Sequence, residues 1–311
     1  MAEQKPIISI DHVSMRFNLA KEKHESLKEY FVALLHGGIR FDEFFALDDV
    51  SFDIMPGDFY GLIGLNGSGK STLVQHLSGL LHPQKGSVCV DGVNLNAKNA
   101  AAKKARNSVG MVFQYPEHQI FAETVYEDIA FGPRNKGLTP EETDRAVKDA
   151  MAFAGLDFET FAQRSPFRLS GGQMRRVAIA GVVAMEPDYL ILDEPSAGLD
   201  PRARDGIFKE IMALYRKRGI AVILVTHNME EAARYATRLL VVSDGRIILD
   251  GVPHEIFTNH KEELLKVSMD VPPVYKLAEC LQEHGLNVKS TPELADLERQ
   301  ILKVRRSRHA D

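Results

Sequence analysis

The sequence predicts an α/β domain built on a parallel sheet, with a helical subdomain inserted in it and a small C-terminal helical extension. An apolar run from residue 59 leads into a glycine-rich loop, and the segment after the loop, Ser71 to Leu81, has helical spacing. Further apolar strands are predicted at Tyr189 to Leu192 and Ala221 to Val225, with a helix between them. Strands that alternate with helices form parallel sheets. Residues from about 122 to 185 are mostly helical, which indicates the inserted subdomain.

Composition excludes several classes of protein. The 311 residues are 44% hydrophobic and 26% charged, as in ordinary globular proteins, and the net charge of -5 gives no general attraction for nucleic acid. Cys89 and Cys280 lie far apart, so neither a disulfide framework nor a zinc site is expected, and a reducing cytoplasm fits best. The first residues lack a basic segment leading into an apolar one, and no run reaches the roughly 18 apolar residues of a membrane span. We expect a protein that is neither exported nor membrane-spanning by itself.

The N-terminal part predicts two strands separated by an insertion. Ile7 to Val13 forms the first strand, and Phe52 to Ile54 ends the second, just before a turn at Pro56-Gly57. Inside the insertion, apolar side chains from Leu27 to Leu35 recur at the spacing of an amphipathic helix. We favour a helix that packs on its own domain over one that docks to a partner.

Cap and turn residues place the remaining elements. Thr139 as N-cap, Pro140 at the first position and Glu142 in a capping box begin a helix of the subdomain. Asp200 and Pro201 begin the helix that precedes the strand at Ala221. The other predicted strands are Ser87 to Val90, Val109 to Phe113, Arg238 to Val242 and Ile247 to Leu249. The last two of these are expected to form a hairpin through Asp244-Gly245. We therefore divide the chain into a domain at 5–255 and a helical extension at 256–311.

The segment GLNGSGKS matches the phosphate-binding loop pattern between a strand and a helix. Its glycines let successive backbone N–H groups point at a phosphate, and the following helix adds the positive end of its dipole. Lys70 would bridge the β- and γ-phosphates, and the Ser71 hydroxyl would bind Mg²⁺ with Thr72 beside it. The remaining phosphate-loop residues are Gly64, Asn66, Gly67, Ser68 and Gly69. The alternative, a structural glycine turn, does not require the whole pattern.

Two carboxylates end an apolar strand, at Asp193 and Glu194, where a buried strand normally avoids charge. In a protein with a phosphate-binding loop this strand end lies beside the nucleotide, so Asp193 can hold Mg²⁺ through water and Glu194 can polarise the attacking water. Alone, such a pair could also be a helix cap or a loop charge.

Three further groups suit a nucleotide site. The segment LSGGQ, with Ser170 as N-cap, places two glycines at the start of a helix, as either a second phosphate cradle or an ordinary capped helix. Gln114 and His227 follow strands at the edge where ligands of α/β sheets gather, although a lone glutamine or histidine is usually structural.

In this order, GLNGSGKS, Gln114, LSGGQ, LILDEP, SAGLD and His227 resemble the nucleotide-binding domain of ABC ATPases over about residues 5–255. The resemblance implies a head-to-tail dimer with ATP between the phosphate loop of one subunit and LSGGQ of the other. Residues that would act across the dimer are Ser170, Gly171, Gly172, Gln173 and Asp200. The resemblance further makes Glu194 the catalytic base and His227 the γ-phosphate sensor, adds Gln114 as a catalytic group and Mg²⁺ ligand, and makes Phe17 the candidate for stacking on adenine.

A narrower resemblance begins near Gly110, where MVFQYPEHQIFAETVYEDIAFGP and MEPDYLILDEPSAGLDP look like ATPase subunits of energy-coupling factor transporters. That family imports vitamins or cobalt-type metals with two ATPase subunits, a transmembrane coupling subunit and a substrate-binding membrane protein. The resemblance implies a peripheral place on the cytoplasmic face of the membrane. Tyr115 to Phe121 would grip the coupling subunit, with Glu117 either paired to a partner arginine or solvated.

The N-terminal part departs from this pattern. The stretch from Phe17 to Leu47 is more similar to ATPases that export polysaccharide or teichoic acid, which keeps an exporter subunit as the alternative. A soluble ABC ATPase acting on DNA or ribosomes is a further alternative, but two cassettes or long coiled coils are not visible. The sequence does not identify the transported substrate, and it does not distinguish a homodimer from a heterodimer.

Overall fold

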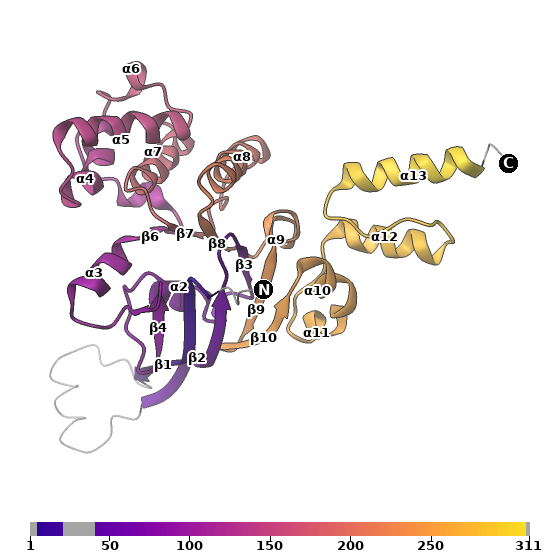
Figure 1. Cartoon of the computed structure of the whole chain (residues 1–311). Helices are drawn as coiled ribbons and strands as arrows, with labels where there is room; N and C mark the ends of the chain where they lie inside the picture. The colour runs from indigo at the N-terminus through magenta and orange to yellow at the C-terminus, as the bar shows by residue number, and fades with distance from the viewer. Residues whose placement is uncertain (1–4, 21–40, 309–311) are drawn as a thin grey trace.

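The computed structural model describes residues 5–20 and 41–308, so the helix predicted from Leu27 to Leu35 lies outside the described residues. Figure 1 shows two β-sheets at the centre, a group of helices above them and the C-terminal helices to one side.

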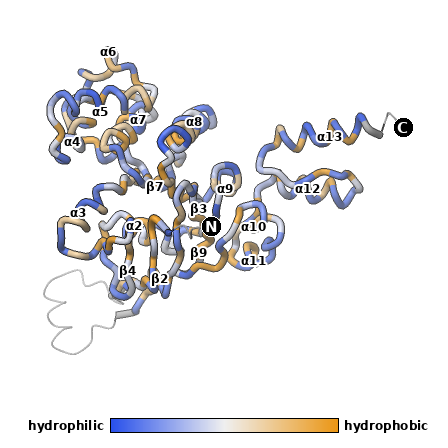
Figure 2. Tube along the Cα trace, in the orientation of Figure 1, coloured by the Kyte–Doolittle hydropathy of each residue, from blue (hydrophilic) through white to orange (hydrophobic). Residues whose placement is uncertain are grey.

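The larger sheet has six strands in the order β10-β9-β3-β8-β7-β6. All neighbours are parallel except the hairpin of β9 and β10, so the predicted parallel sheet and its closing hairpin are confirmed. The strands are β3 (Phe59–Ile63), β6 (Val109–Val112), β7 (Tyr189–Asp193), β8 (Ala221–Val225), β9 (Arg238–Ser243) and β10 (Arg246–Gly251). Every residue of β3, β7 and β8 is buried, as expected of parallel strands covered on both faces. Figure 2 shows the apolar residues concentrated along these strands.

The smaller sheet is antiparallel, in the order β2-β1-β4-β5. Its strands are β1 (Ile8–Ala20), β2 (Phe41–Ile54), β4 (Lys85–Val90) and β5 (Val93–Asn94). β1 is much longer than the predicted strand, since it pairs with β2 as far as Ala20. Register shifts after Ile10, Val13 and Met15 interrupt the alternation of faces, which hides the second half of the strand from a search for period-two patterns.

Helices flank the larger sheet. Those between the sheets and within the subdomain are α2 (Lys70–Leu77), α3 (Ala100–Asn107), η1 (Pro116–Gln119), α4 (Val125–Asn135), α5 (Pro140–Phe153), α6 (Phe158–Phe161), η2 (Pro166–Arg168) and α7 (Gly171–Val183). The predicted capping box of Thr139 and Glu142 is confirmed at the start of α5. The subdomain is not separate in its packing, because Met151 and Val177 share a core with Leu192 of β7.

The last helices are α8 (Pro201–Arg218), α9 (Met229–Tyr235), α10 (Pro253–Asn259), α11 (Lys261–Lys266), α12 (Pro273–Glu283) and α13 (Leu294–Arg308). Asp200 caps α8 as predicted. Phe257 and Tyr275 pack with Leu239 and Val241 of β9, so the chain after residue 256 begins on the sheet. α12 and α13 then form a small core of their own and project from the body (Figure 1). Across residues 5–20 and 41–308, no helix is both long and apolar enough to span a bilayer.

Candidate nucleotide-binding site

A cavity of about 390 Å³ opens where β3, β6 and β7 end. The loop after β3 and the start of α2 form its floor, and the paired strands β1 and β2 form one wall. Ten of the predicted site residues line it together: Phe17, Asn66, Gly67, Gly69, Lys70, Ser71, Thr72, Gln114, Asp193 and Glu194.

Two glycines of the loop are required by geometry. A Cβ at Gly64 would lie 2.3 Å from the carbonyl oxygen of Val242, and one at Gly69 would lie 2.3 Å from that of Ala46. Gly69 also has a φ of +107°, which side chains rarely adopt. The loop therefore packs its backbone directly against neighbouring strands, an approach that only glycine permits.

Lys70 is buried at the centre of this loop, with 7% of its surface exposed. Its Nζ donates to the carbonyl oxygens of Gly64 and Leu65, both at 2.8 Å. Burial lowers the pKa of Lys70, while the nearby carboxylates of Glu194 and Asp193 act in the opposite direction. The ammonium is thus held at the cavity wall by weakly competing carbonyls that a phosphate can replace.

Asp193 and Glu194 are both 7% exposed. Burial, then repulsion by Glu194, raises the pKa of Asp193, and a hydrogen bond from Ser71 together with the charge of Lys70 opposes the shift. Glu194 follows the strand with a φ of +51°, and its N–H donates to the carbonyl of Val225 at 2.9 Å. This turn aims its carboxylate at His227, whose Nδ1 lies 2.8 Å from Oε1 and 2.7 Å from Oε2. Glu194 and His227 therefore act as one polar pair at the sheet edge.

The donor set fits Mg²⁺ bound together with a nucleotide. Ser71, Gln114 and Asp193 present oxygen atoms at the same cavity. Mg²⁺ prefers oxygen ligands and is usually held by one or two carboxylates plus substrate phosphates. The described residues contain no group of three or more His, Cys, Asp or Glu side chains that could hold a metal ion.

The aromatic wall contains a residue that sequence reasoning missed. Phe17 of β1 is paired with Phe44 of β2, and both line the cavity. They are 40% and 46% exposed, so both rings present apolar surface at its edge. Only the strand register could have identified Phe44, because the sequence places it inside an apparent insertion.

The LSGGQ segment does not reach this cavity. Ser170 caps α7, and the side chain of Gln173 accepts from the N–H of Ser170 at 3.0 Å, which completes a capping box. A Cβ at Gly171 or Gly172 would meet nothing within 4 Å, so the helix start faces open space. Asp200 likewise lies on the surface, where it caps α8.

The segment Tyr115 to Phe121 corrects one expectation. Glu117 neither faces solvent nor stands free for a partner arginine, because its Oε2 lies 3.3 Å from Nε of Arg175 in the same chain and its side chain is 19% exposed. Arg175, the fifth residue of α7, thus already occupies the position expected of the partner's arginine. The exposed residues of the segment are Tyr115, His118, Gln119 and Phe121, of which Tyr115 and Phe121 are large and hydrophobic. Phe121 contacts Phe131 edge-to-face at 4.9 Å over a groove of about 470 Å³.

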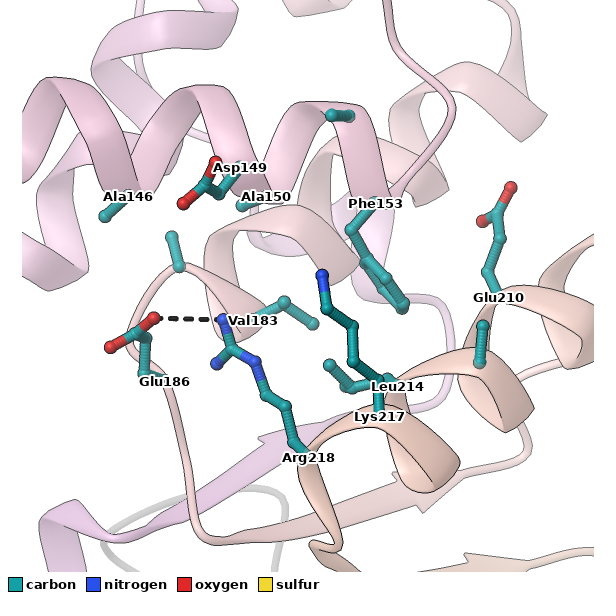
Figure 3. Close-up of a pocket in the computed structure, with 13 residues that line it drawn as sticks. Ala146, Asp149, Ala150, Phe153, Val183, Glu186, Glu210, Leu214, Lys217 and Arg218 are labelled. Carbon is teal, nitrogen blue, oxygen red and sulfur yellow. Dashed lines mark hydrogen bonds and ion pairs between the residues drawn. The ribbon is translucent and has the colours of Figure 1, made fainter.

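Another cavity, of about 410 Å³, lies between α5 and α8 (Figure 3). Arg218 pairs there with Glu186 at 2.9 Å, and Lys217 and Asp149 add opposite charges. None of the predicted site residues lines it, so it is separate from the phosphate loop.

Comparison with known proteins decides the family. The profile described as ABC transporter matches residues 47–197, and one described as an AAA domain matches 163–233. The energy-coupling factor transporter ATP-binding protein EcfA2 of Clostridium tetani is 48% identical over 260 residues, or 83% of this chain and 90% of that protein. The chain belongs to the ABC transporter ATPase family. The predicted fold and the predicted ATPase activity of a transporter subunit are thereby confirmed.

Solved structures agree with this ABC ATPase in fold. The structure of cbiO1 from Clostridium perfringens, described as part of the ABC transporter complex cbiONQ, has a TM-score of 0.67 and 34% identity, and the match covers 89% of this chain and 100% of that one. The cassette MJ0796, solved as a dimer after hydrolysis with ADP and Pi, has a TM-score of 0.66 and 26% identity, with 79% and 98% covered.

Proposed function

We propose that this ABC ATPase binds and hydrolyses ATP with Mg²⁺ and powers micronutrient uptake, of a vitamin or a cobalt- or nickel-type metal, as part of an energy-coupling factor complex. The observation that carries the proposal is the convergence of the phosphate loop, Lys70, Asp193 and Glu194 on one cavity. The names of its relatives give the transporter class, since the protein of C. tetani is an energy-coupling factor subunit and cbiO1 belongs to cbiONQ.

The chemistry assigned to each residue follows from its place. The N–H groups of the loop and Lys70 bind the β- and γ-phosphates, and Ser71, Gln114 and Asp193 hold Mg²⁺, which neutralises phosphate charge when bound. Glu194 accepts the proton of the attacking water, and His227, whose Nδ1 lies within hydrogen-bond distance of both its oxygens, fixes the orientation of the carboxylate. Phe17 and Phe44 cover the adenine at the outer wall.

A second ATPase subunit completes the site in this proposal. At the helix start Ser170 and Gly171 are exposed, and a Cβ at Gly171 or Gly172 would meet nothing within 4 Å, as a surface that binds the γ-phosphate of a partner's ATP requires. Asp200 lies on the loop that would communicate across the dimer. MJ0796, which was solved as a dimer, supports this arrangement.

The membrane partner docks, we propose, on the groove beside Tyr115 to Phe121, and holds the protein at the cytoplasmic face of the membrane. Phe121 is 61% exposed and Phe131 50%, although they contact each other. Exposed aromatic side chains beside a groove are typical of protein interfaces. In this assembly a separate membrane protein binds the transported substrate.

Co-purification from the native host tests the proposal. A tagged chain should retain a second ATPase, a transmembrane coupling protein and a small integral substrate-binding protein, identified by mass spectrometry. Phe121→Asp should release the membrane proteins while nucleotide binding stays intact, and Phe167→Asp, at an aromatic that is 62% exposed outside the groove, is the matched control. Capture of a polytopic exporter instead would favour the exporter alternative.

A further inference from the structure

A buried arginine connects two segments of the chain that lie far apart in the sequence. Arg175 of α7 is 2% exposed, which makes it the largest fully buried side chain of the described chain. Arginine is almost never buried without partners, because its charge cannot be removed by losing a proton. Its partners therefore show what the position is for.

The guanidinium contacts both segments at once. Its Nε faces Oε2 of Glu117 at 3.3 Å, and Nη1 donates to the carbonyl oxygen of Ala197 at 2.6 Å. Glu117 belongs to the segment Tyr115 to Phe121, beside the proposed docking groove. Ala197 belongs to the loop Ser196 to Asp200, which follows the catalytic strand end.

The loop is tied to the catalytic pair from its other side. The N–H of Ala197 donates to the carbonyl of Glu194 at 3.1 Å. Ser196 donates to Glu231 at 2.7 Å, and Glu231 also accepts from Thr226, the neighbour of His227, at 2.9 Å. A displacement of Ala197 therefore changes hydrogen bonds next to Glu194 and, through Ser196 and Glu231, next to His227.

We propose that Arg175 is a positioning residue that couples the segment Tyr115 to Phe121 to the loop Ser196 to Asp200. This coupling depends on the proposed function in one respect: it takes a docked membrane partner as the cause of movement in the segment Tyr115 to Phe121. Guanidinium donors have fixed relative directions, so Nε and Nη1 cannot follow two partners that move apart. Loss of either contact would leave a buried charge or a buried carbonyl without its partner, so the two segments move together.

The adjacent residue supplies a matched control. Arg176 lies on the same helix with its side chain 30% exposed. It contacts the carbonyl of Ala154 at 3.3 Å and Glu210 at 3.8 Å, and neither belongs to the two coupled segments. A lysine at either position keeps the charge and removes the planar guanidinium. Arg175→Lys and Arg176→Lys are thus the same chemical change on neighbouring residues of one helix, made at different contacts and at different burial.

Hydrogen–deuterium exchange on the purified chain tests the link without any partner. Arg175→Lys should speed amide exchange in both segments by about tenfold, and ATP should no longer change their protection together. Arg176→Lys should leave both segments as in the wild type. Faster exchange throughout α7 with unchanged behaviour of the two segments would overturn the proposal, because Arg175 would then only stabilise its helix. Should Arg175→Lys fail to fold, Glu117→Gln weakens the same contact from its other partner and is judged by the same criterion.

The complex purified from its host allows transport and ATP hydrolysis to be measured together. Transport per ATP hydrolysed should fall about tenfold in Arg175→Lys and in Glu117→Gln, with KM for ATP within about twofold of wild type, and the double variant should be no worse than either single one. Equal loss of hydrolysis and transport, or additive effects, would contradict coupling through this pair. If the wild-type chain retains no membrane partner, the proposed function fails, and the exchange experiment still decides the role of Arg175.

Discussion

Replacing Gly69 with alanine tests whether the phosphate loop has the backbone that the structure gives it. Gly69 is the N-cap of α2, with a φ of +107° and a ψ of -4°. Its missing side chain leaves room for the backbone of β2, since a Cβ there would lie 2.3 Å from the carbonyl oxygen of Ala46 and 3.2 Å from Cδ2 of Leu47. Alanine therefore introduces two separate costs.

Both costs follow from the geometry. A left-handed backbone costs a residue with a side chain about 1–2 kcal/mol relative to glycine. The contact with Ala46 requires the loop and β2 to separate, and overpacking of this kind costs about 1–3 kcal/mol. The free energy of unfolding should thus fall by about 2–5 kcal/mol. Gly67 separates the two terms, because it has a φ of +80° with nothing within 4 Å, so Gly67→Ala should cost only about 1–2 kcal/mol.

Thermal unfolding of the nucleotide-free proteins, followed by circular dichroism, measures the difference. Gly69→Ala should have the clearly lower midpoint, and it should also bind ATP more weakly because the loop has moved from β2. Equal midpoints for Gly69→Ala and Gly67→Ala would refute the argument, since the loop would then not pack against Ala46 as described.

Three more substitutions test other parts of the site. Glu194→Gln should bind ATP but hydrolyse it about 10²–10⁴-fold more slowly, because the proton acceptor is lost, and size-exclusion chromatography with ATP should show an accumulated dimer; wild-type turnover would remove Glu194 as the base. Phe44→Ala should weaken ATP binding about tenfold by fluorescence titration, since base–aromatic stacking contributes ~1–3 kcal/mol, whereas Phe45→Ala, outside the cavity, should not. The buried carboxylate of Asp193 has a raised pKa and repels Glu194, so Asp193→Asn should raise the unfolding midpoint of the nucleotide-free protein. The same variant should lose Mg²⁺-dependent hydrolysis. A lowered midpoint would contradict the argument from repulsion.

Local sequence patterns predict those parts of the fold in which a single local feature, such as an apolar run or a capping residue, determines the element. The fully apolar strand at Ala221 to Val225 has the predicted bounds, and the capping residues Thr139 and Asp200 begin their helices as expected. The length of β1 could not be predicted, because bulges break its alternation and its pairing with β2 is set by contacts more than twenty residues away along the chain.

The site divides in the same way. The phosphate loop and the acidic strand end have chemistry that is visible in adjacent residues. Phe44 and Arg175 depend on tertiary contacts, one through strand register and the other through burial against Glu117 and Ala197. A buried arginine has no signature in sequence, since the same residue on a helix is usually solvated.

The most direct test of the central claim compares two complexes isolated from the host, one with the wild-type chain and one with Lys70→Ala. ATP hydrolysis and transport are measured for both. Lys70 holds its ammonium at the cavity wall through the carbonyls of Gly64 and Leu65, so its removal takes away the charge that meets the phosphates. The account predicts that Mg²⁺-dependent ATP hydrolysis falls by about 100-fold or more and that ATP-driven uptake into proteoliposomes is lost with it. Lys70→Ala complexes that hydrolyse ATP and sustain uptake at wild-type rates would contradict the claim that this cavity powers the transporter.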